Sequence, residues 1–184
     1  SLRGTAETGV DQGGTVGVRE SVVRTGANPQ GERVLYEVIE ADDAIPSHNP
    51  KTWRSRTDYP EGVQERPYST SEGEQLKVTQ VQQQFDPALP LANTIAAVDG
   101  PPLVTGGAKR IVLGGNGRTM GMQLAFESPA AAKAYRDELT RRASSFGIDP
   151  ASFAKMKKPM LVRTVVGLTD TSPVADLTAA GRRY

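Results

Sequence analysis

Apolar and polar residues alternate in only a few stretches of the chain, and those stretches predict its β-strands. Residues 34–39 alternate regularly, which predicts a strand buried on one face and partly buried on the other. Residues 101–113 contain two short apolar runs joined by a Gly-Gly pair, a pattern typical of a tight hairpin. A final strand is predicted at 158–168 and a short one at 18–23.

A second set of stretches has helical spacing. Ser71 precedes the first of them and Glu74 lies three residues later, the spacing of a capping box. Pro129 stands at a favoured first-turn position, and Gly147 is suited to end the same helix. The predicted helices cover residues 71–85, 118–127, 129–147 and 149–156. Together with the strands they predict an α/β (α+β) fold, a small mixed sheet with three to four helices.

Composition divides the chain into one domain and two flanking segments. Residues 1–31 are rich in Gly and Thr and contain few large apolar groups, so we expect a flexible linker. The domain is predicted at 32–168, and residues 169–184 form a polar tail that is either disordered or docked on a partner. Within the domain, 47–73 is predicted as a long, proline-interrupted loop and 86–102 as turns with a short helix.

The charge and the rare residue types narrow the classes of function. The formal net charge is +1, so overall charge does not favour a nucleic acid as partner. The absence of cysteine excludes disulfides and Cys-ligated zinc, and a single histidine, His48, excludes a multi-His metal site. No apolar run reaches the ~20 residues of a membrane helix, and no signal peptide is apparent. We therefore expect a cytoplasmic module without membrane contact, and Ser1 in place of Met indicates a piece of a longer protein.

The stretch IVLGGNGRTM, residues 111–120, places glycines and an arginine where a predicted strand passes into a predicted helix. Glycine lets the backbone approach a ligand closely, and the first turn of a helix offers unpaired N–H groups with a partial positive charge. An arginine adds a planar fork for phosphate oxygens. The alternative is a plain glycine-rich turn with a solvated arginine. The residues predicted to bind phosphate here are Gly114, Gly115, Asn116, Gly117, Arg118 and Thr119.

Three known phosphate motifs do not fit this turn. A Walker loop requires a Lys after its glycines, and none follows here. The dinucleotide fingerprint fails because Met120 stands in the place of its third Gly. The core Gly-Asn-Gly-Arg resembles that of Fic enzymes, but Arg110 occupies the position of their catalytic histidine.

Residues outside the turn are further candidates for chemistry. His48 can serve as a general base near neutral pH, or it can simply bond its own loop. The long loop interleaves arginines with aromatic residues, which suits phosphate contacts and base stacking, and Arg66 is the best candidate because Pro67 makes its segment rigid. Of Asp42 and Asp43, at most one could hold Mg²⁺, because adjacent strand residues point to opposite faces.

The order of these pieces resembles the ParB/sulfiredoxin superfamily, most closely the DdrB-like ParB domains of phages and mobile elements. The resemblance rests on the stretches YEVIEADDAIPSHNP, ERPYS, FDPALPLANTIAAVDGPPLV and IVLGGNGRTMGMQLA, and it covers residues 32–168. In that superfamily a proline-containing box faces the glycine-rich motif. The resemblance therefore implies that Ser47, His48, Asn49 and Arg66 form the wall opposite the turn.

Departures from the superfamily pattern limit what the resemblance implies. Asn116 replaces the sulfiredoxin cysteine, and Thr119 occupies the place of the second ParB arginine. What remains implied is a module that binds the phosphates of a nucleotide or nucleic acid, with a nucleoside triphosphate and Mg²⁺ as cofactors. An enzyme of this kind would be a Mg²⁺-dependent nuclease or nucleoside triphosphatase, with His48 as base and Arg118 stabilising charge on the phosphate. The alternative is a non-catalytic, DNA-associating or assembly module of an antirestriction-type protein.

The same resemblance sets expectations for partners and location. The partners would be nucleotide or DNA and the other domains of a larger phage- or mobile-element-encoded protein. Such a protein acts in the cytoplasm or is delivered into a cell.

Overall fold

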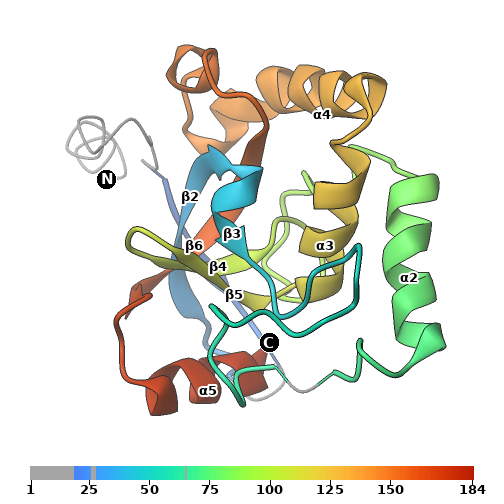
Figure 1. Ribbon diagram of the computed structural model, residues 1–184. Helices are drawn as coiled ribbons and strands as arrows, with labels where there is room; N and C mark the ends of the chain where they lie inside the picture. Colours follow the sequence, from blue (N-terminus) through green and yellow to red (C-terminus); the bar gives the residue numbers. More distant parts are fainter. Residues whose placement is uncertain (1–18, 26–27, 65) are drawn as a thin grey trace.

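A mixed six-stranded β-sheet lies at the centre of the protein (Figure 1). The structure is a computed structural model that describes residues 19–25, 28–64 and 66–184. The strands are β1 (Glu20–Val23), β2 (Glu32–Glu40), β3 (Ala44–Ile45), β4 (Leu103–Gly106), β5 (Arg110–Gly114) and β6 (Pro159–Thr169). Their order in the sheet is β1-β2-β6-β4-β5-β3. The pairs β4/β6 and β3/β5 are parallel, and the other neighbours are antiparallel.

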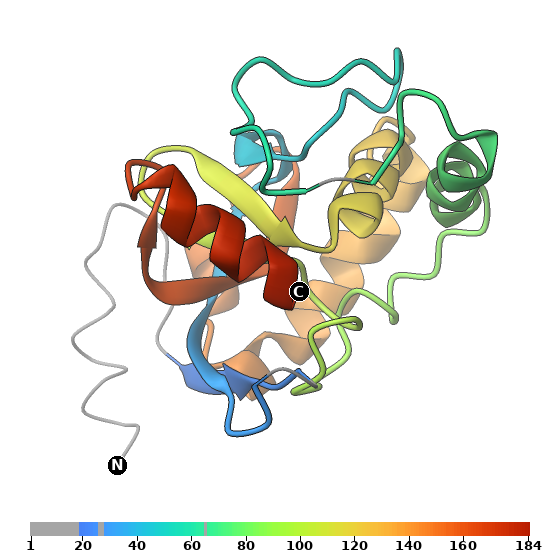
Figure 2. The same cartoon turned by 90° about the horizontal axis from the view of Figure 1, so that it is seen from below.

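Helices cover both faces of this sheet (Figures 1 and 2). They are α2 (Glu72–Gln83), α3 (Asn116–Ala125), α4 (Pro129–Arg142) and α5 (Val174–Arg183). One face packs Val104 and Val112 against α3 and α4, and the opposite face packs Leu113 against Leu177 of α5. The helix α2 stands beside α3 rather than on the sheet. The predicted α+β fold with a small mixed sheet is confirmed, and no helix in the described part of the chain is long and apolar enough to span a membrane.

Local sequence signals explain most of the elements. Ser71 and Ser128 accept hydrogen bonds from backbone N–H groups at the starts of α2 and α4, as N-caps do. The predicted helix at 149–156 is wrong in type, because only a short 3₁₀ segment forms after the cap residue Asp149. The short helix predicted within 86–102 is also wrong, since these residues form turns, bends and one isolated β-bridge at Ala96. Pro87, Pro90 and the Pro-Pro pair that precedes β4 interrupt any helix there.

Both flanking segments contain secondary structure. The short strand predicted near residue 20 is confirmed as β1, which pairs with β2, so the described part of the predicted linker joins the sheet. The linker prediction for residues 1–18 lies outside the described residues. Of the two alternatives for the polar tail at 169–184, the disordered one is wrong, because α5 forms there and buries Leu177 and Ala180. The helix α5 packs closely against the long loop at Gly181. A β-carbon added to Gly181 would stand only 2.2 Å from the carbonyl oxygen of Val63, so the two backbones are in contact.

Arg163 is a fully buried arginine in β6 that holds the segment 94–101 in place. Its guanidinium donates five hydrogen bonds to backbone carbonyls between Thr94 and Pro101, with N···O distances from 2.5 to 3.5 Å. Burial lowers the pKa of Arg163 to about 10, which leaves the side chain charged at neutral pH. The carbonyl groups compensate this buried charge. The same hydrogen bonds attach the segment 94–101 to β6 in the middle of the sheet.

Candidate functional site

The glycine-rich turn joins the end of β5 to the start of α3. Gly115 precedes the helix with a φ of 85°, a left-handed conformation that glycine adopts without strain. The side-chain oxygen of Asn116 accepts a hydrogen bond from the backbone N–H of Ser47 at 2.7 Å. The hydroxyl of Thr119 donates to the carbonyl of Gly115 at 2.9 Å. The turn is therefore held from both sides, and the first N–H groups of α3, which have no carbonyl partner within the helix, carry a partial positive charge.

Arg118 folds back over this turn from the first turn of α3. A β-carbon on Gly115 would stand only 2.7 Å from Nη2 of Arg118, so the guanidinium lies directly against the glycine. It donates to the carbonyl of Val98 and, at 3.2 Å, to that of Ala97. Burial lowers the pKa of Arg118, and its Nε is buried without a hydrogen-bond partner among the described residues. The guanidinium is thus positioned beside the helix start with one donor unused.

A cavity of about 260 Å³ lies at this end of α3. Three cationic side chains line it: Arg66 from the long loop, Lys77 from α2 and Arg118 from α3. Within the described part of the chain, Glu74 contributes the one side-chain carboxylate of the lining. Tyr68 contributes an aromatic ring to the wall. The excess of positive charge and the helix start together suit an anion.

The structure separates the predicted site residues into two groups. Those that line the cavity are Arg66, Gly115, Asn116, Gly117 and Arg118. Gly114 is buried, and a β-carbon there would stand 2.7 Å from Cβ of Tyr184. Thr119 is also buried and serves the turn through its bond to Gly115. Asn49 is exposed, and its side chain accepts from the N–H of Lys51 at 2.8 Å, which shapes its own loop. Neither Ser47 nor His48 is part of the described lining.

His48 lies behind the cavity wall. Its Nδ1 is 2.8 Å from the hydroxyl oxygen of Ser47, and its Nε2 is 3.3 Å from that of Ser55. The ring meets Tyr68 edge-on, with 5.3 Å between the ring centres, and Tyr68 is the residue that faces the cavity. Burial lowers the pKa of His48, so the ring is neutral at pH 7. These contacts favour the alternative in which His48 bonds its own loop.

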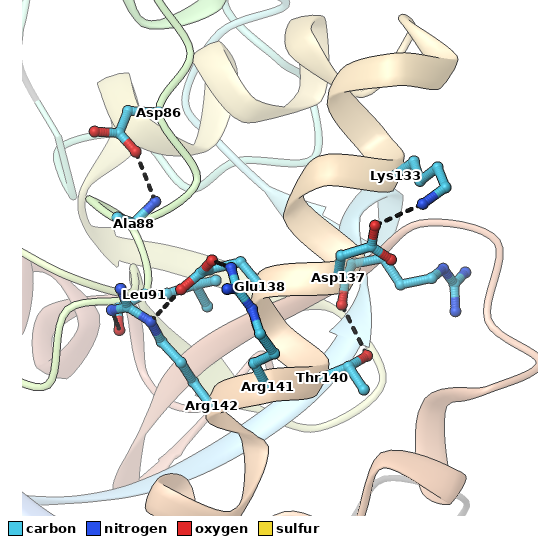
Figure 3. Close-up of polar contacts among 10 residues, drawn as sticks. Asp86, Ala88, Leu91, Lys133, Asp137, Glu138, Thr140, Arg141 and Arg142 are labelled. Atoms are coloured by element: carbon cyan, nitrogen blue, oxygen red, sulfur yellow. Dashed lines mark hydrogen bonds and ion pairs between the residues drawn. The ribbon is translucent and has the colours of Figure 1, made fainter.

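Three of the four basic residues of α4 are paired with carboxylates of the same helix (Figure 3). Arg141 and Arg142 both pair with Glu138, and Lys133 pairs with Asp137 at 2.6 Å. Arg136 donates instead to backbone carbonyls of residues 153–157. The helix keeps an excess of positive charge, but each of its basic side chains is already engaged in contacts within the protein. The α4 face therefore has the character of a solvated helix surface.

The acidic candidates do not form a metal centre. Asp42 and Asp43 are exposed in a short 3₁₀ segment that precedes β3. Within the described ranges, no group of three or more His, Asp or Glu side chains is placed to hold a metal ion. In the long loop, Asp58 is paired with Arg56 through two hydrogen bonds of 2.8 Å.

Among the cavity residues that the sequence did not indicate are Glu74, Lys77 and Tyr184. Glu74 and Lys77 lie three residues apart on α2, a spacing that could have indicated their mutual pairing but not the cavity that they enter. Nothing in the sequence indicates that Tyr184 reaches the cavity, because the helix α5 that precedes it is not predicted. All three depend on how α2 and α5 pack around the turn.

A mixed sheet flanked by helices, with a glycine-rich turn leading from a strand into a helix, is the architecture expected of a ParB-like domain. The family model of the ddrB-like ParB superfamily domain matches residues 28–166, and the chain belongs to this family. The match confirms the resemblance found in the sequence, and it ends before α5, so Tyr184 lies outside the matched residues. Comparison with curated proteins and with solved structures found no match.

Gly115→Ala is expected to lower stability by about 1–3 kcal/mol, since alanine disfavours a φ of 85° and its β-carbon would displace Arg118. The melting temperature should fall by roughly 2–4 °C per kcal/mol. Gly167→Ala is the matched control, because Gly167 has a φ of 91° but no atom within 4 Å of the added carbon. An equal loss in both variants would contradict the close contact between Gly115 and Arg118.

Proposed function

We propose that this ParB-like domain binds the phosphate group of a nucleotide at the start of α3. The observation that carries the proposal is the convergence of Arg66, Lys77 and Arg118 on one cavity at a helix N-terminus. Backbone N–H groups of a first helical turn and guanidinium groups are the donors that phosphate oxygens prefer. The unused Nε of Arg118 supplies a further donor for such an oxygen.

A small nucleotide is favoured over duplex DNA as the ligand. Binding to a duplex relies on several phosphate contacts spread along a surface. Here three cations, two of them sharing Glu74, surround a single cavity of about 260 Å³. The basic side chains of α4 are instead engaged by carboxylates or by backbone carbonyls. The formal net charge of +1 also offers no general attraction to a polyanion.

We propose binding only, without nuclease or triphosphatase activity. A hydrolase needs a group that activates water beside the phosphate. His48 lies behind Tyr68, and both of its ring nitrogens are within hydrogen-bond distance of serine hydroxyls. The cavity therefore offers no histidine for this role within the described residues.

We propose that any Mg²⁺ at this site is bound by the nucleotide rather than by the protein. Mg²⁺ at phosphate sites keeps waters and phosphate oxygens together with one or two carboxylates. Glu74 is the sole side-chain carboxylate of the described lining, and it is already paired with Lys77 at 3.2 Å. This donor set does not fit a metal held by the protein alone.

A thermal-shift screen of the purified chain tests the proposal. The ligands are ATP, CTP, GTP, UTP, NAD and short DNA, each with and without Mg²⁺. A ligand at 100 times its Kd stabilises the folded state by about 2.7 kcal/mol, which corresponds to roughly 5–10 °C for a domain of this size. We expect such a rise with at least one nucleotide. Flat curves with every nucleotide would contradict the proposal and favour a non-catalytic assembly role.

A further inference from the structure

Glu74 faces the cavity, although its position in the sequence predicts a role in the cap of α2. In a capping box the glutamate bonds back to the N–H of the cap residue. Here Ser71 does accept from the N–H of Glu74, at 3.3 Å, but the N–H of Ser71 donates to the carbonyl of Pro67 at 2.8 Å. The cap is complete without the carboxylate, which instead lines the cavity.

The two carboxylate oxygens of Glu74 differ in their partners. Oε1 accepts a hydrogen bond from Nζ of Lys77 at 3.2 Å. Oε2 is buried and lies 3.9 Å from Nη1 of Arg66, which is too long for a hydrogen bond. It has no hydrogen-bond partner among the described residues. Because buried polar atoms are nearly always hydrogen-bonded, Oε2 is an acceptor still open to a donor from a ligand.

Arg118, which also lines the cavity, has an unused buried donor in its Nε. A ligand that satisfies both atoms must carry an acceptor, such as a phosphate oxygen, and a hydrogen-bond donor within the same space of about 260 Å³. A phosphate dianion without a hydroxyl group offers acceptors only, and the negative charge of Glu74 repels it. A hydroxyl on the ligand removes this conflict because it donates to the carboxylate.

We propose that Glu74 accepts a hydrogen bond from a hydroxyl group of the ligand. The cavity then selects phosphate monoesters that carry a free hydroxyl, such as sugar phosphates and nucleoside 5′-phosphates, over esters that lack one. This inference rests on the proposed function, because binding of the phosphate at the start of α3 is what brings the hydroxyl to Glu74.

Titration by NMR with ribose 5-phosphate and propyl phosphate, in EDTA at pH 8, tests the inference. The wild-type chain is expected to bind ribose 5-phosphate about tenfold more tightly, the value of one hydrogen bond to a charged acceptor. In Glu74→Gln the preference should fall to about threefold, because a neutral acceptor is roughly half as strong. In Glu74→Ala it should vanish, and both variants should bind propyl phosphate more tightly than the wild type does.

Glu72→Gln is the matched control, because Glu72 lies in the same first turn of α2 but is exposed and does not line the cavity. Glu72→Gln should keep the tenfold preference for ribose 5-phosphate. An equal loss of preference in Glu72→Gln would show that only the net charge near the cavity matters, and it would overturn the inference.

Equal binding of both esters by the wild type would overturn the inference while leaving the phosphate site intact. A preference that appears only when Mg²⁺ replaces EDTA would make Glu74 a metal ligand and overturn it as well. Failure of every phosphate and nucleotide to bind would overturn the proposed function together with the inference.

Discussion

Replacement of Arg118 by alanine is expected to weaken nucleotide binding by on the order of 10–100-fold, because hydrogen bonds to a charged group contribute about 1.5–3 kcal/mol. The guanidinium lies against Gly115 at the helix start and has an unused Nε donor. Its loss removes both the charge and the fork from the place where the phosphate is proposed to bind. Calorimetric titration with the nucleotide that the thermal-shift screen identifies measures the change in Kd.

Two further variants separate this effect from a general change in charge. Arg141→Ala removes an exposed arginine that is paired on α4, and its Kd should equal that of the wild type. Arg118→Lys keeps the charge without the planar fork, and its affinity should lie between those of wild type and Arg118→Ala. Melting temperatures are measured in parallel, because Arg118 also bonds the carbonyls of Ala97 and Val98. Unchanged affinity in a folded Arg118→Ala protein would show that the ligand does not bind at this turn.

Replacement of Arg163 by methionine is expected to destabilise the folded state by about 3–5 kcal/mol, since several buried carbonyls lose their donor at once. The position of the segment 94–101 depends on these bonds, which join it to β6. For a domain of this size the melting temperature should fall on the order of 10 °C. Chemical denaturation gives the free energy of unfolding independently.

The matched control is Arg33→Met on β2, where the arginine side chain is 67 % exposed and pairs with Glu20 at the surface. We expect its stability to change by less than about 1 kcal/mol. Because the segment 94–101 also carries the carbonyls that hold Arg118, Arg163→Met should weaken nucleotide binding at temperatures where the variant remains folded. A small loss of stability, close to that of Arg33→Met, would mean that other contacts hold the segment.

The elements that could be predicted from sequence are those specified by neighbouring residues. The β4–β5 hairpin follows from two apolar runs around a Gly-Gly pair, and α2 begins after the cap residue Ser71. The start of α3 was predictable for the same reason, because only glycine adopts the left-handed conformation of Gly115 readily. Each of these signals acts within a few residues and needs no distant partner.

The elements that escaped prediction depend on distant partners. The helix α5 is polar apart from a narrow stripe, and it is stabilised by packing on the sheet and on the loop around Val63, more than a hundred residues away in sequence. Arg163 appeared as an ordinary residue of a strand, since nothing near it in sequence indicates the carbonyl groups of segment 94–101. Helical propensity over a short polar segment is too weak to reveal such packing.

The sequence by itself determined the ParB-like family, the mixed sheet with its helices, and the glycine-rich turn with Arg118 as the candidate phosphate contact. Only the tertiary structure decided which other side chains join that turn. It brought Arg66, Lys77 and Glu74 into one cavity and placed His48 behind Tyr68. The physical reason is that a turn is specified by the conformational preferences of adjacent residues, whereas the walls of a cavity are specified by how separate elements pack against one another.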